Sequence, residues 1–121
     1  MAYRSFEDLE VWKRASNLAV RIYEELRTCK DFGLKDQMTR AAVSIASNIA
    51  EGAERDTKPE YIRYLHIAKG SAAELRTQLY IASKIQVISG NVQVELTDEL
   101  KEISRMLHGM IRTFRKSSVK G

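Results

Sequence analysis

The sequence has little of several features that would narrow its function at once. Its 121 residues include one cysteine, Cys29, and one proline, Pro59. A lone cysteine cannot form a disulfide within the chain, and it excludes both a Cys-x-x-Cys-His haem attachment and a cysteine-based zinc framework. The start of the chain has no apolar signal core, and its apolar runs are far shorter than the roughly 18 residues of a membrane span. We therefore expect a cytoplasmic protein with no membrane association.

Motifs that carry chemistry are also missing. Bundles that hold two irons use Glu-x-x-His pairs, but the residues three positions before His66 and His108 are Arg63 and Arg105. The glycines are scattered, so no glycine-rich loop is present to hold a phosphate. Isolated glutamates on long helices are typical of solvated or ion-paired faces. We expect no enzymatic activity, no cofactor and no metal.

What the chain does have is apolar spacing typical of helices. Apolar residues at three- and four-residue steps predict helices at about residues 6–29 and 34–51, the second ending at Gly52 in a left-handed C-cap. A third helix is predicted from Thr57, which can cap it, with Pro59 in its first turn, to near residues 89 and 90. A fourth begins between residues 92 and 97. With short connections and no alternating strand pattern, residues 1–121 are predicted to form one all-α domain, an up-down four-helix bundle.

Small side chains dominate two of these segments, SIASNIAEGAER (residues 44–55) and RYLHIAKGSAAEL (residues 63–75). Small residues let helix backbones approach closely, so the two segments are predicted to form a seam. A glycine inside a helix costs about 1 kcal/mol relative to alanine, which a close neighbour of Gly70 would explain. Ile81, Ile85 and Ile88 lie off the main apolar stripe and favour a second buried surface, although a wide core stripe would also account for them. The predicted seam or interface residues are Ser44, Asn48, Glu51, Gly70, Ser71, Ile81 and Ile85.

Positive charge is in modest excess, with 20 Lys and Arg against 16 Asp and Glu and a formal net charge of +4. From Ile103 onward the chain has no carboxylate. Lysine and arginine near a helix C-terminus complement the helix dipole, which explains some of these charges but not all. Delocalised positive charge of this kind also binds phosphate backbones. The candidate nucleic-acid contacts are Arg14, Arg21, Lys69, Arg76, Arg105, Arg112, Arg115 and Lys116.

Three blocks carry a family resemblance: FEDLEVWKRA (residues 6–15), residues 37–55, and RYLHIAKGSAAEL. Together they resemble the 23S rRNA intervening sequence proteins. The resemblance implies a small bacterial four-helix bundle that assembles into a homo-oligomeric ring, commonly a pentamer, without enzymatic activity. The family name suggests contact with RNA. A related accessory protein of diversity-generating retroelements has a similar barrel, for which nucleic acid and a reverse transcriptase are the expected partners.

Two functions from different classes follow. The first is a non-catalytic, oligomeric protein that binds nucleic acid, RNA or DNA, through a basic surface. The second is a protein-interaction scaffold or accessory protein without direct nucleic-acid contact, in which the apolar surface and the face of Asn48 and Glu51 bind another protein. Salt-dependent binding of nucleic acid distinguishes the first from the second.

Overall fold

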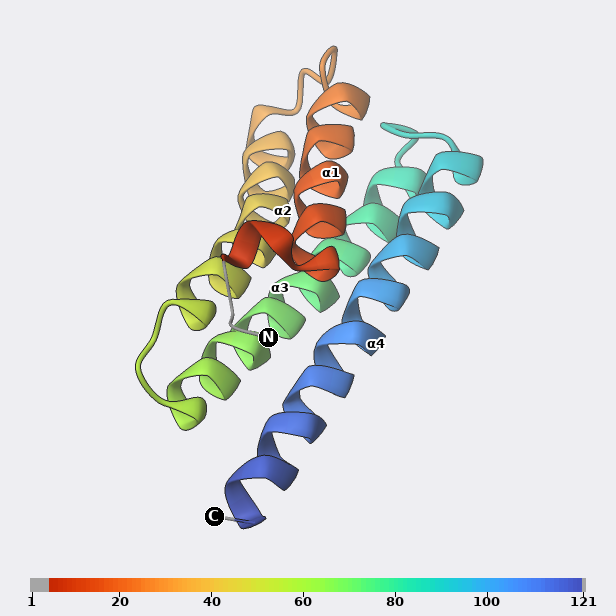
Figure 1. Ribbon diagram of the computed structural model, residues 1–121. Coiled ribbons are helices and arrows are strands. Elements are labelled where there is room, and N and C mark those ends of the chain that lie inside the picture. The colour runs from red at the N-terminus through yellow and green to blue at the C-terminus, as the bar shows by residue number, and fades with distance from the viewer. Residues whose placement is uncertain (1–4, 121) are drawn as a thin grey trace.

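Four α-helices joined by short connections make up the chain in this computed structural model, which describes residues 5–120, with side chains described as far as Ser117 (Figure 1). A short 3₁₀ helix, η1 (Phe6–Asp8), precedes α1 (Glu10–Glu25), α2 (Phe32–Ala53), α3 (Lys58–Lys84) and α4 (Gly90–Lys120). Residues 5–120 contain no β-strand. None of the helices in this part of the chain combines the length and the apolar character that a bilayer crossing demands.

The helices follow one another around the bundle in chain order. Each packs against its neighbours in sequence, and α1 also packs against α4, whereas within residues 5–120 neither diagonal pair is in contact. The α2–α3 contact is the most extensive and the α1–α4 contact is the least extensive of the four. This is the up-down arrangement predicted from the short connections, and it leaves a groove on the surface between α1 and α4.

The core consists of the apolar stripes that the sequence predicts. Side chains from all four helices are completely buried, for example Ile22, Ile45, Leu65 and Leu107. In the third helix the buried apolar residues recur at three- and four-residue steps, and they are Leu65, Ala68, Ala72, Leu75, Leu79 and Ala82. Each large apolar side chain removed from water in this way stabilises the fold by about 1.5–3 kcal/mol.

The first helix is shorter than predicted at both ends. The Ser5 side chain accepts a hydrogen bond from the Glu7 amide at 3.2 Å and so caps η1 rather than a long helix. Leu9 is extended (φ −73°, ψ 125°), which separates η1 from α1. Ser5 therefore starts a separate turn before α1.

Gly52 does not end α2 in a left-handed cap, and that prediction is wrong. It lies inside the helix, which continues to Ala53. A Cβ atom at Gly52 would lie 2.8 Å from the Tyr64 Cβ and 3.0 Å from the Tyr61 Cδ1. The glycine is therefore needed for the close approach of α2 and α3.

The α3–α4 turn is built from a non-glycine residue in the left-handed region. Gln86 has φ 66°, and the amide of Val87 donates to the Ala82 carbonyl at 2.8 Å, which is the bonding of a Schellman motif. This ends α3 at Lys84, earlier than predicted, and α4 begins at Gly90 rather than at residues 92–97. Because the chain turns back here, Ile88 is only 7% exposed and belongs to the core instead of the second surface expected for it.

Candidate nucleic-acid interface

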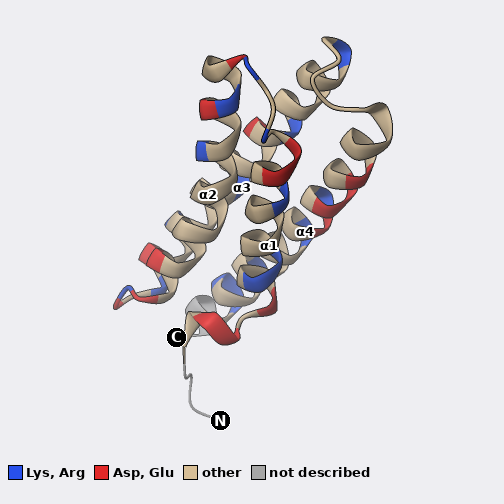
Figure 2. Ribbon diagram, turned by 90° about the horizontal axis from the view of Figure 1, so that it is seen from above, with Lys and Arg blue, Asp and Glu red and all other residues tan. Residues whose placement is uncertain are grey.

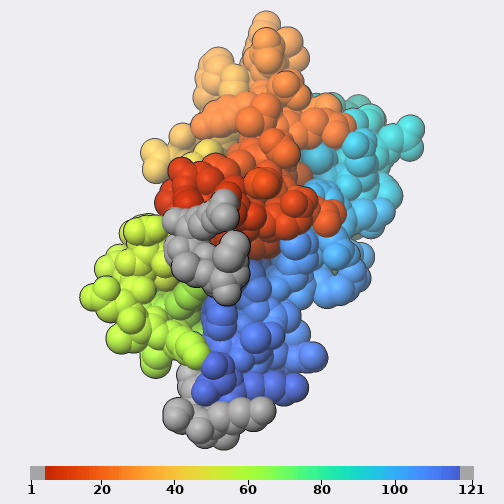
Figure 3. All heavy atoms as spheres, viewed as in Figure 1, coloured from red at the N-terminus to blue at the C-terminus, as the bar shows by residue number. Residues whose placement is uncertain are grey.

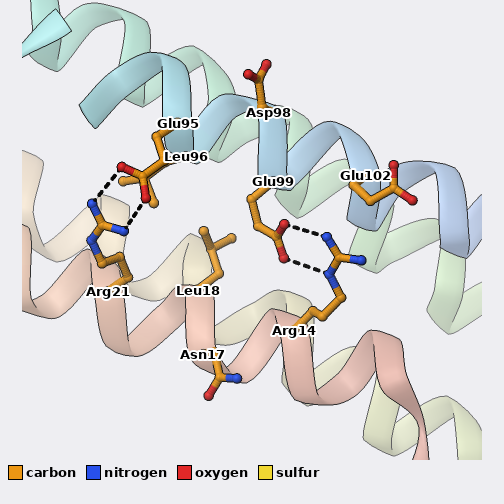
Figure 4. Close-up of a pocket in the computed structure, with 9 residues that line it drawn as sticks. All are labelled: Arg14, Asn17, Leu18, Arg21, Glu95, Leu96, Asp98, Glu99 and Glu102. Carbon is orange, nitrogen blue, oxygen red and sulfur yellow. Dashed lines mark hydrogen bonds and ion pairs between the residues drawn. The ribbon is translucent and has the colours of Figure 1, made fainter. Parts of the chain in front are cut away.

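In the groove between α1 and α4, carboxylates neutralise two of the arginines that were predicted to contact phosphates. Arg14 donates to both carboxylate oxygens of Glu99, at 2.6 and 2.8 Å, and Arg21 donates to both oxygens of Glu95, at 2.7 and 3.1 Å (Figure 4). The hydrogen bond and the charge of Arg21 hold the pKa of Glu95 below its usual range. The sequence placed both arginines among the nucleic-acid contacts, whereas the structure pairs their charges with carboxylates of α4.

This groove as a whole is acidic. Asp98 and Glu102 line it beside Glu95 and Glu99, so the groove has four carboxylates and two arginines, although Asp98 points away from α1 (Figure 4). Figure 2 shows the acidic residues of α4 gathered in the half of the helix that follows its start, which is the half next to α1. Arg105 pairs with Glu102 and is also partly neutralised. A polyanion is repelled from a surface of this composition.

The side of α4 that faces α3 is basic instead of acidic. Arg115 Nη2 lies 3.1 Å from His66 Nε2, and Lys69 Nζ lies 3.5 Å from His108 Nδ1, so each contact joins a basic residue of one helix to a histidine of the other. The pKa of His66 is lowered from its ordinary value of 6.5 by loss of solvent and by the positive charges of Arg115, Lys69 and His108. Loss of solvent is the largest of these causes, so the basic character of this surface rests on Lys69 and Arg115 themselves.

The same interhelical surface continues toward the start of α4. Arg76 of α3 and Lys101 of α4 line one pocket, and no carboxylate lines it. Lys69, Arg76, Lys101 and Arg115 therefore follow the α3–α4 boundary, and we call these four residues the basic groove. Lys69 and Arg76 are seven residues apart on one helix, which corresponds to about 10 Å.

Lys101 is the member of the basic groove that the sequence analysis missed. Lys101 could have been identified from the register in which α3 and α4 pack antiparallel to each other. The Tyr61 and Phe114 rings, whose centroids lie 4.7 Å apart, set this register near the end of α4. This register places Lys101 opposite Arg76. The register depends on where the two helices end and on the turn between them, and neither was predicted correctly from the sequence.

The remaining predicted cations are exposed on the last turns of α4. Arg112 borders an apolar surface formed with Leu9, Met110 and Phe114, and Lys116 lies one turn farther on. Neither forms an ion pair with a carboxylate of the described residues. Figure 3 shows this end of α4 on the surface beside the start of α3.

Polar side chains of the predicted small-residue seam connect α2 to α3 as a ladder of hydrogen bonds. The Ser44 and Ser71 hydroxyl oxygens lie 2.9 Å apart, and the Asn48 amide donates to the Ser44 carbonyl at 2.8 Å and to its hydroxyl at 2.9 Å. Glu51 is not part of this ladder, because it is exposed and pairs with Arg55 at 3.5 Å. The three partly buried side chains hold the two helices in register.

Some of the predicted interface residues are exposed to solvent in the single chain. A Cβ atom at Gly70 would meet nothing within 4 Å, so the close neighbour expected for this glycine is not supplied by the chain itself. Ile67, Ile81 and Ile85 of the same helical region are 41%, 46% and 53% exposed. These four residues, the last of which caps the helix, have no cover in the described part of the chain, and we call them the apolar face of α3. The exposed Glu74 lies on the same side of the helix, seven residues after Ile67 and seven before Ile81.

The fold and the basic groove define a small helical-bundle protein with one electropositive interhelical surface. Among the described residues no three His, Cys, Asp or Glu side chains are grouped to hold a metal ion. The chain belongs to the 23S rRNA-intervening sequence protein family, whose family model matches residues 7–109. The family resemblance noted in the sequence is thus confirmed.

A solved structure supports the same assignment. A protein with unknown function from the S23 ribosomal protein family of Bacteroides thetaiotaomicron VPI-5482 is 27% identical to this chain, with a TM-score of 0.79. The alignment covers 84% of this chain and 97% of that one. No curated protein matched the sequence. Neither the family description nor the name of the similar structure specifies a chemical reaction.

Proposed function

We propose that this chain is a non-catalytic, cytoplasmic nucleic-acid-binding protein that holds RNA along the basic groove between α3 and α4. The observation that carries the proposal is the separation of charge on the two sides of α4. The α1 side holds carboxylates that neutralise its arginines, while Arg76 and Lys101 on the α3 side line a pocket without a carboxylate. Cations without carboxylate partners can neutralise phosphates and so release the counterions that the nucleic acid holds.

RNA is favoured over DNA by the family description, which names 23S rRNA, and by the similar structure, which is named for a ribosomal protein family. Both backbones carry phosphates, so the cations of the groove do not by themselves distinguish RNA from DNA. The relation to retroelement accessory proteins remains a prediction from sequence resemblance.

The proposed contact set differs from the one read from the sequence. It keeps Lys69, Arg76 and Arg115, adds Lys101, and retains Arg112 and Lys116 as exposed cations at the end of α4. Arg14, Arg21 and Arg105 are left out because each donates to a carboxylate within the chain.

A salt titration of RNA binding tests the proposal. Binding of single-stranded RNA, duplex RNA and duplex DNA is measured from about 50 to 300 mM salt by fluorescence anisotropy. Six phosphate contacts per chain, the four cations of the basic groove with Arg112 and Lys116, predict that the logarithm of the affinity falls with the logarithm of the salt concentration at a slope of roughly −4 for a single strand. Absence of measurable binding at the lowest salt concentration contradicts the proposal.

We further propose that copies of the chain assemble into a ring, a pentamer by family resemblance, through the apolar face of α3. The unoccupied space at Gly70 and the exposure of Ile67, Ile81 and Ile85 support this assembly, because a helix from a second copy would cover them. Repeated grooves on one ring would raise the affinity for a long RNA by linkage, with no new type of contact.

The assembly predicts a mass about five times that of the chain, measured by light scattering at micromolar concentration. Ile81→Arg places a charge in the proposed contact and is expected to shift the mass toward one chain. Val20→Arg is the matched control, since Val20 is 57% exposed but lies on α1, diagonal to α3. A wild-type mass equal to one chain, or equal effects of the two variants, argues against this assembly.

The scaffold function is the second candidate, and the exposed apolar face of α3 is the observation that favours it. In that case the face binds a different protein and the basic groove only keeps the protein soluble. A monomeric wild-type protein without RNA affinity is the combined result that supports the scaffold over the ring.

A further inference from the structure

The pocket lined by Arg76 and Lys101 contains other functional groups besides its two positive charges. Besides these two cations it is lined by an aromatic ring and by small and polar side chains, chiefly Thr77, Tyr80, Gln93 and Thr97. We propose that this pocket is a subsite for one unpaired nucleotide, with the phosphate on Arg76 and Lys101 and the base stacked on Tyr80. The inference rests on the proposed function and specifies single-stranded RNA as its ligand.

Arg76 supplies the first argument. Its Nε is buried and has no hydrogen-bond partner among the described residues. A buried donor without an acceptor is costly, and a guanidinium presents its donors in a fork that matches phosphate oxygens. Lys101 contributes a second positive charge from the facing helix. Because Arg76 Nε is out of reach of solvent, a phosphate in this pocket would pair with the terminal Nη donors of Arg76 and with Lys101, and it would compensate both charges.

Tyr80 supplies the second argument. It lies one helical turn beyond Arg76, about 6 Å along α3, and its side chain is 56% exposed at the same pocket. An exposed aromatic ring beside a cationic groove is the usual platform for an unpaired base. Lys84 Nζ lies over one face of the ring, 5.3 Å from its centre, so the base would stack on the opposite face.

The polar residues of α4 supply the third argument. Gln93 Nε2 donates to Thr97 Oγ1 at 3.1 Å, which fixes the orientation of the amide. The amide oxygen of Gln93 accepts no hydrogen bond from the described residues, so it remains available to a donor on the edge of a base. Charge, a stacking surface and a fixed polar group thus meet in one pocket.

Duplex RNA provides the contrast that tests the subsite, because paired and stacked bases cannot reach Tyr80. Tyr80→Leu is expected to weaken binding of a single-stranded oligonucleotide about ten- to a hundredfold and to change duplex binding less than twofold. The salt slope should stay the same, since no charge is removed. Tyr80→Phe should restore the single-strand affinity, because it restores the ring.

Two controls make the comparison specific. Tyr23→Leu removes a similarly exposed tyrosine, 49% exposed on α1, and should leave both affinities unchanged. An oligonucleotide containing 2-aminopurine reports stacking directly, and its fluorescence should fall on binding to the wild type and to Tyr80→Phe but not to Tyr80→Leu. Thermal unfolding of each variant confirms that the bundle remains folded.

The outcomes separate this inference from the proposed function. If wild-type protein binds RNA but Tyr80→Leu matches it on single strands, or loses duplex binding equally, the subsite is wrong and the basic groove stands. If the wild type binds neither single-stranded nor duplex RNA, both proposals fail.

Discussion

Replacing Lys69, Arg76, Lys101 and Arg115 together with glutamine is expected to weaken binding of single-stranded RNA about a thousandfold at roughly 50 mM salt. Each phosphate contact contributes about 0.7 to the salt slope, so losing four should flatten the slope by roughly 3. By the same slope, each phosphate contact makes the affinity at roughly 50 mM salt about tenfold higher than at 1 M salt. Anisotropy titrations of wild type and variant over a range of salt concentrations give both quantities.

A matched pair of double variants separates the groove from overall charge. Arg76→Gln with Lys101→Gln removes two cations from the basic groove, and Arg14→Gln with Arg21→Gln removes two from the α1–α4 groove. The first pair should lose about a hundredfold in affinity, whereas the second should lose less than threefold, because those arginines already donate to Glu99 and Glu95. Equal losses would show that net charge, and not the position of the cations, governs binding.

Gly52→Ala is expected to destabilise the fold by about 1–2 kcal/mol, a fall in melting temperature of roughly 4–8 °C. The new Cβ would lie 2.8 Å from the Tyr64 Cβ and 3.3 Å from the Tyr61 carbonyl oxygen. Neither atom is the far end of a flexible side chain, so α2 and α3 have to separate. The better helix propensity of alanine, about 1 kcal/mol, offsets only part of this overpacking.

Gly109→Ala is the control for this prediction. Gly109 also lies inside a helix, but a Cβ atom there would meet nothing within 4 Å. The same substitution should therefore stabilise the fold by about 0.5–1 kcal/mol. Urea unfolding of the two variants should give changes of opposite sign. If both variants gain stability, the α2–α3 contact at Gly52 has enough freedom to adjust, and the predicted overpacking is wrong.

The proposed nucleic-acid surface was only partly predictable from the sequence. Lys69 and Arg76 lie one heptad apart on one helix, so local spacing is enough to group them. Arg14 and Arg21 were placed in the same set because their partners, 85 and 74 residues away, cannot be recognised from local spacing. Lys101 was missed for the corresponding reason, since it joins the groove only through the register of α4 against α3.

Turn geometry shows the same division between local and long-range information. Thr57 was predicted to cap α3, and its side chain accepts from the Glu60 amide at 3.3 Å, because capping involves residues within one turn. Gly52 was predicted to end α2 but instead provides space for Tyr64 of another helix. Gln86 took the left-handed position for which glycine is the usual residue, so the end of α3 carried no recognisable signal.

The sequence by itself determined that four amphipathic helices bury one apolar stripe each, because helical periodicity is a property of neighbouring residues. Only the tertiary structure decided the order of the helices around the bundle, and with it which side of α4 faces α1 and which faces α3. That choice sets which cations meet carboxylates and which remain free. Charge pairing acts between side chains close in space, and those side chains come from opposite ends of the chain.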